Sequence, residues 1–170
     1  MFRKRFCRFL ALETLVIAAL ATTASAQTAD TWTSVRTKNL SIIGNTSTHN
    51  ILATAARLEQ FRTTFSRLYP TLRLDNGRPT QIVIFKDAAA YFDFLPKRPD
   101  GSADVGVAGY FQAGEDTNYI TFAISPNQFD PLSTAVHEYV HSVLDSNFDK
   151  SSLPPWLNEG MAEVFSTMTE

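Results

Sequence analysis

The chain has 170 residues, of which 44% are hydrophobic and 19% are charged, and its formal net charge is −2. This composition is typical of one globular domain and excludes a fibrous or intrinsically disordered chain. The slightly acidic balance lacks the basic surface with which proteins bind nucleic acid or anionic membranes, so we expect neither partner.

The first 26 residues have the pattern of a secretory signal peptide. A basic start that includes Arg3 and Arg8 precedes the apolar run 15–21, and the small residues 24–26 form a cleavage site. The alternative is an uncleaved membrane anchor, but a spanning helix needs about 20 mostly apolar residues and this stretch is shorter. We therefore expect an exported protein, periplasmic or extracellular, with no stable membrane insertion after cleavage.

The predicted mature domain, 27–170, differs in charge from the whole chain. Cleavage removes four basic side chains and one acidic side chain, which leaves 144 residues with a net charge of about −5. The only cysteine, Cys7, lies in the predicted signal peptide, so the mature domain has no disulfide. A domain of this size has to be stabilised by its hydrophobic core.

The mature chain begins with a strand region and a long helix. One or two strands are predicted over 32–43, and they end at the turn residues Gly44-Asn45. Ser47 or Thr48 can cap a helix that extends to about residue 68. Apolar residues recur in it at spacings of three and four, which predicts one buried face.

The middle of the chain predicts short strands and a loop. The apolar run 81–85 is typical of a buried strand, and Asp87 can cap a short helix after it. Residues 96–106 are rich in Pro, Asp and Gly and predict a surface loop. The runs 107–112 and 118–125 are strand-like and flank a hairpin connection.

Two helices complete the domain. Asp130 and Pro131 are typical of the N-cap and first position of a helix that extends to about residue 144. A final helix begins at Pro154-Pro155. The expected fold class is α+β, with a small, mainly antiparallel sheet followed by two helices that carry polar groups.

The first of these helices contains the HExxH pattern His137-Glu138-Tyr139-Val140-His141. Residues four apart differ by about 40° around a helix and 6 Å along it, so both imidazoles can reach one metal ion. Glu138 is turned about 100° from His137, where it can accept a proton from water that the metal activates. The alternative, histidines that only pair with Glu138, is costly on so apolar a helix. The pattern predicts a Zn²⁺ site.

The third ligand has to come from another element. Asp145 lies eight residues beyond His137, about 12 Å along the same helix, and cannot reach the same ion. Glu159 follows His141 by 18 residues, across a break that allows the chain to reverse, and Glu163 shares its helix face. His49, the third histidine, has no metal-ligating residues near it in sequence, and we expect it in a loop or at a helix start.

The pattern, followed by Trp156-Leu157-Asn158-Glu159-Gly160, resembles the gluzincin zinc metallopeptidases of clan MA, which include thermolysin-like and aminopeptidase N-like enzymes. It is most similar to secreted bacterial peptidase-like domains that are often followed by tetratricopeptide repeats. The similarity is specific over about 134–165. It implies a zincin-like fold in which His137, His141 and Glu159 bind zinc.

The same resemblance implies roles for other residues. Glu138 would be the catalytic base, and Glu163 would hydrogen-bond a ligand histidine. In gluzincins an antiparallel edge strand beside the zinc helix binds extended substrate, which suggests that role for 118–124 and a peptide or protein as substrate.

One catalytic component is not identified by the sequence. Gluzincins usually have a Tyr or His after the third ligand that stabilises the oxyanion, but the chain ends at Glu170. We therefore expect the C-terminal part of the catalytic domain to be missing. Tyr110 or Tyr139 could replace the oxyanion-stabilising residue, but no sequence pattern places either of them at the site. Two functions stay open. The first is zinc-dependent hydrolysis of peptide bonds. The second is a zinc-stabilised but catalytically idle protein, which is either a binding or assembly module or an inactive fragment of a longer peptidase.

Overall fold

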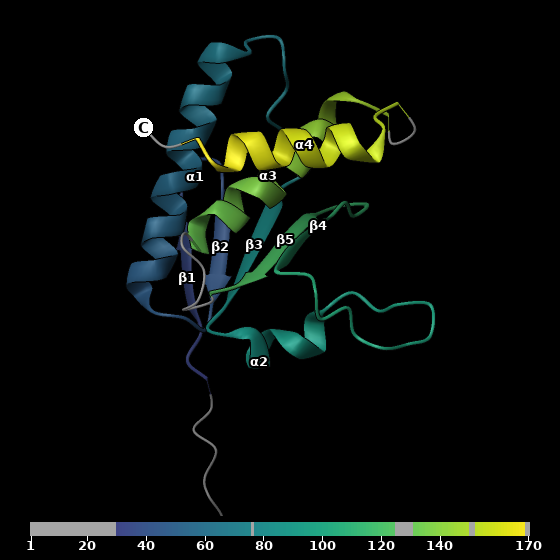
Figure 1. The fold of residues 1–170 in the computed structure, drawn as a ribbon. Helices are drawn as coiled ribbons and strands as arrows, with labels where there is room; N and C mark the ends of the chain where they lie inside the picture. The colour runs from purple at the N-terminus through teal and green to yellow at the C-terminus, as the bar shows by residue number, and fades with distance from the viewer. Residues whose placement is uncertain (1–29, 76, 125–130, 150–151, 169–170) are drawn as a thin grey trace, which may run out of the picture.

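The computed structural model describes residues 30–75, 77–124, 131–149 and 152–168. They form a five-stranded sheet with helices on both faces (Figure 1). The predicted signal peptide 1–26 and the predicted cap Asp130 lie outside these residues. Within the described part of the chain, no helix is long and apolar enough to cross a membrane.

The strand order in the sheet is β1-β2-β3-β5-β4. The strands are β1 (Thr33–Arg36), β2 (Ser41–Gly44), β3 (Thr80–Phe85), β4 (Gly109–Gln112) and β5 (Asn118–Ala123). The α+β class is confirmed. The expected antiparallel pairing holds for the outer pairs β1–β2 and β4–β5, whereas the inner pairs β2–β3 and β3–β5 are parallel. Each parallel pair is joined by a long crossover, as parallel strands require.

The helices begin and end close to the predicted residues. They are α1 (Thr48–Leu68), α2 (Ala88–Tyr91), α3 (Pro131–Asn147) and α4 (Pro155–Ser166), and a 3₁₀ turn, η1 (Phe92–Phe94), extends α2. The Ser47 side chain accepts the Asn50 backbone N–H at 3.2 Å, and Asp87 accepts that of Ala90 at 2.8 Å, which confirms both predicted caps.

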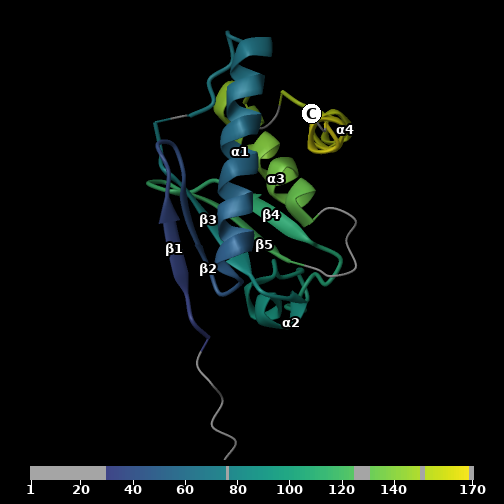
Figure 2. The same cartoon turned by 90° about the vertical axis from the view of Figure 1, so that its left-hand side faces the viewer.

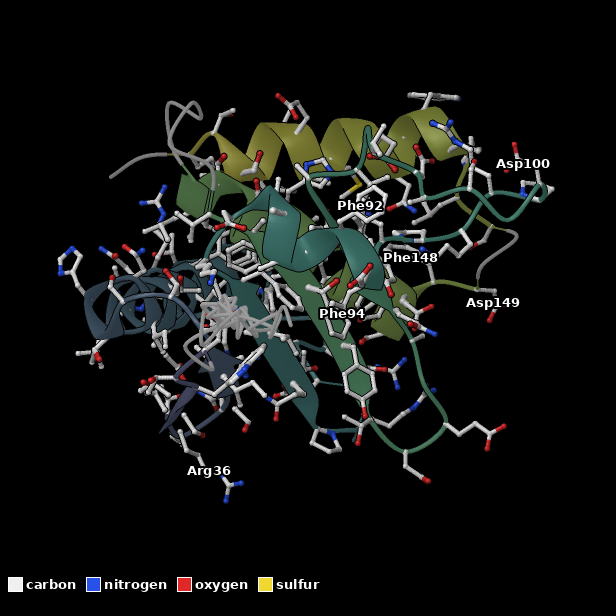
Figure 3. The ribbon with its side chains drawn as sticks, turned by 90° about the horizontal axis from the view of Figure 1, so that it is seen from below. Arg36, Phe92, Phe94, Asp100, Phe148 and Asp149 are labelled. Atoms are coloured by element: carbon white, nitrogen blue, oxygen red, sulfur yellow. The ribbon has the colours of Figure 1, made fainter. Side chains whose placement is uncertain are left out.

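Two hydrophobic cores lie on opposite faces of the sheet. Ile82 and Ile84 of β3 belong to the larger core, which α1 and α3 cover. Phe85 belongs to a smaller core under α2, where its ring lies 4.7 Å from that of Phe94. Figure 3 shows Phe92 and Phe94 on this short helical segment, seen from below. Side chains alternate between the faces because successive residues of a strand point in opposite directions.

Helix α4 forms the outermost layer. It packs against α3 on the side away from the sheet and is seen end-on in Figure 2. Ala162 and Ser166 of α4 are buried, whereas Trp156 and Val164 are exposed. This packing places the polar flank of α4 over the polar face of α3.

Candidate metal centre

Three predicted ligands come together where α4 crosses α3. The Nε2 atoms of His137 and His141 lie 3.3 Å and 3.6 Å from the same oxygen, Oε2 of Glu159. All three ligand atoms lie within 4.8 Å of one another. Asp145 and His49 are not part of this cluster, as predicted; His49 is exposed near the start of α1.

This arrangement fits a zinc ion. Donor atoms about 2.0–2.2 Å from a tetrahedral ion lie roughly 3.3 Å from one another, close to both separations from the Glu159 oxygen. Burial and the neighbouring His141 hold the pKa of His137 below its ordinary value, which favours the neutral imidazole that binds metal. Two imidazoles and one carboxylate are a typical donor set for catalytic zinc.

Two side chains of α4 contact the far nitrogens of the histidines. Asn158 Oδ1 lies 2.9 Å from Nδ1 of His141, so it can accept a hydrogen bond that leaves Nε2 free for metal. Glu163 Oε2 lies 3.8 Å from Nδ1 of His137, on the predicted side but beyond hydrogen-bond distance. Asn158 had no predicted role. Its position directly before a predicted ligand was the only sequence signal.

We expect Asn158→Ala to weaken zinc binding by about 10-fold to 100-fold, because the variant no longer fixes the tautomer and orientation of His141. Asn158→Asp is the matched control, since it keeps an oxygen acceptor at the same place. Competition against a chromophoric zinc chelator measures the affinities. Equal affinity of wild type and Asn158→Ala would contradict this role.

Glu138 lies beside the ligands but does not join them. It is 6% exposed and accepts a hydrogen bond from the backbone N–H of Phe111 in β4. Burial raises the pKa of Glu138 to about 7, and the hydrogen bond opposes this rise. A carboxyl group with such a pKa can both accept and release a proton near neutral pH.

A cleft of about 720 Å³ contains these groups. Its walls are β4 and the segment before it, α3 and α4. Phe148 and Asp149, which are labelled in Figure 3, also line it. The prediction that 118–124 forms the strand at the sheet edge is wrong: β5 lies between β3 and β4, and β4 is the edge strand.

The free edge of β4 faces this cleft. Ala123 N–H donates to the Ala108 carbonyl, so these paired residues point their backbone groups at each other. Because such pairs alternate in an antiparallel ladder, Gly109 and Phe111 point theirs outward, away from β5. The hydrogen bond from Phe111 to Glu138 agrees with this assignment.

Neither tyrosine considered as an oxyanion donor is placed for that role. The hydroxyl of Tyr139 is buried, donates to the Leu74 carbonyl at 3.2 Å and accepts a hydrogen bond from Arg62. Tyr110 lines the cleft, but its side chain packs against the core under α2 and its hydroxyl donates to Gln112 at 3.3 Å. Tyr139 instead fixes α3 to α1.

Arg62 completes this anchor behind the site. The guanidinium is 6% exposed and forms two hydrogen bonds to Asp75, at 3.0 Å and 2.9 Å. Together with Tyr139 it joins α1, α3 and the segment after α1.

Comparison of the chain with protein-family models and with curated proteins gives no match, so the candidate site rests on its own geometry.

Proposed function

We propose that this protein is an exported zinc-dependent peptidase of the gluzincin type. The observation that carries the proposal is the placement of two histidines and a glutamate around one point, with the buried carboxyl of Glu138 beside them in an open cleft. His137, His141 and Glu159 would hold the metal, and a zinc ion bound there would polarise a carbonyl and lower the pKa of water toward 7.

Glu138 acts as the general base. Its carboxylate accepts a proton from the attacking water and then donates that proton to the nitrogen of the departing amine. Overall, water is added across the peptide C–N bond and no other reactant is needed.

The edge of β4 favours an extended peptide as substrate. Gly109 and the carbonyl of Phe111 offer outward backbone groups in the same cleft as the candidate ligands, while Phe111 N–H is held by Glu138. An extended peptide can pair with such an edge through main-chain hydrogen bonds, which hold it without a demand for one particular sequence. This support comes from β4, not from the strand that the sequence suggested.

Metal removal tests the proposal. We expect purified protein to cleave members of a mixed peptide library, to lose this activity with a zinc chelator and to regain it when zinc is restored. Mass spectrometry of the products identifies the bonds cleaved. Cleavage that continues at full rate in the chelator, with metal analysis confirming that zinc is gone, would contradict a metallopeptidase.

A zinc-stabilised module without turnover is the second candidate. It is favoured by the positions of Tyr110 and Tyr139, neither of which is directed at the candidate metal centre. Stoichiometric zinc that raises the melting temperature, with no hydrolysis of any library peptide, would support this function over catalysis.

A further inference from the structure

Helix α3 contacts the edge strand β4 at a glycine. A Cβ atom built on Gly109 would lie 2.7 Å from Cγ2 of Thr134 and 2.9 Å from Cβ of Phe122. Both distances are too short for real carbon atoms, so any side chain at position 109 has to displace the helix or the strand. Gly160 of α4 differs, because its added Cβ would meet nothing within 4 Å.

The contact at Gly109 is in register with the one at Glu138. From Thr134 to Glu138 the helix advances one turn, about 6 Å, and both residues share a face. Two residues of β4, from Gly109 to Phe111, advance about 6.8 Å along the same direction. The contact between Gly109 and Thr134 therefore lies one helical turn before the hydrogen bond between Phe111 N–H and Glu138.

We propose that Gly109 is a positioning residue for Glu138: the absence of a side chain allows α3 to approach β4 until Phe111 N–H holds the Glu138 carboxylate. The hydrogen bond gives this carboxylate one fixed orientation in the cleft. The metal ligands depend less on Gly109, because all three lie on α3 and α4, which pack against each other. The inference rests on the proposed function only where activity is measured.

The first test needs no activity. Hydrogen–deuterium exchange of the Phe111 amide, followed by NMR in zinc-free protein, reports its hydrogen bond directly. We expect Gly109→Ala to exchange this amide at least about tenfold faster than wild type and the matched control Gly160→Ala. Glu138→Ala, which removes the acceptor, gives the rate of the released amide. Unchanged protection in Gly109→Ala, or faster exchange throughout β5 as well, would overturn the proposal.

The second test separates positioning from general loss of structure. We expect Gly109→Ala to lower kcat about 10-fold to 100-fold, because small displacements of a catalytic group have effects of this size, while KM and zinc affinity change less than about threefold. Adding Thr134→Ser, which removes the colliding methyl and keeps the hydroxyl, should restore part of both kcat and amide protection. A matching loss of zinc affinity would mean that the site as a whole is distorted and would reject the positioning role.

The experiment stays decisive if Gly109→Ala does not fold or if the wild type is inactive. If Gly109→Ala does not fold, Thr134→Leu crowds the same contact from the helix and is measured in its place. If wild type binds zinc but cleaves no peptide, the proposed function fails while amide exchange still decides whether Gly109 positions Glu138.

Discussion

Glu138→Gln is expected to lower kcat/KM for peptide cleavage by about 10²-fold to 10⁴-fold while zinc remains bound, because an amide cannot accept the proton of the attacking water. The substitution changes little else. Gln has nearly the same shape, and its carbonyl oxygen can still accept the hydrogen bond from Phe111 N–H. His137, His141 and Glu159 keep their positions, so metal analysis should give the same zinc content as for wild type.

Asp145→Asn is the matched control for this prediction. Asp145 lines the same cleft and is not a candidate ligand, so its replacement removes one negative charge without removing the base. A much smaller loss in Asp145→Asn than in Glu138→Gln assigns the effect to proton transfer. Equal cleavage by wild type and Glu138→Gln would remove Glu138 as the base and with it the proposed mechanism.

The local patterns predicted the elements of this fold but not the order of its strands. The helices, their caps at Ser47 and Asp87, and the strand regions follow from side-chain periodicity and turn residues, which are properties of short segments. Which strand of the hairpin pairs with β3 depends on contacts between distant segments. The resemblance suggested 118–124 for the edge, whereas β4, with its glycine and fewer residues, has the features of an edge strand.

Some residues of the candidate site could likewise be predicted from short segments of sequence, and others could not. His137, Glu138 and His141 lie on one helix, so helical geometry alone placed them, and a chain reversal sufficed to suggest Glu159. The contacts of Asn158 and Gly109 depend on how α4 and β4 meet α3, which no short segment encodes.

Tyr139 could have been excluded as an oxyanion donor from the sequence. It lies two residues after His137, about 200° around the helix, and so points away from the predicted ligands. The structure places its ring in the core beside Phe61, with the ring centroids 6.1 Å apart.

The buried carboxyl of Glu138 should also make the stability of the zinc-free protein depend on pH. Its pKa is about 7 in the folded protein and near the ordinary glutamate value of 4.5 in the unfolded chain. The folded state therefore binds the proton more tightly. The resulting stability is fully present below about pH 4.5 and is lost as the pH rises to about 7, in total about 3 kcal/mol.

Glu138→Gln isolates this contribution, because the amide stays neutral at every pH. In chelator, we expect the free energy of unfolding of this variant to exceed that of wild type by about 3 kcal/mol at pH 8 and to approach it at pH 4.5. Urea denaturation at several pH values measures the difference, and other titrating groups cancel because both proteins share them. Glu115→Gln, at an exposed position of the β4–β5 turn, should track wild type instead.

Parallel stability curves for wild type and Glu138→Gln would show that Glu138 is solvated in the folded protein and is not tuned for proton transfer. A stability gain that grows with pH, combined with loss of cleavage in the zinc-bound form, would have the opposite meaning. It would show that burial of one carboxyl group destabilises the fold and provides the base that hydrolysis needs, as expected where stability and activity conflict at a single residue.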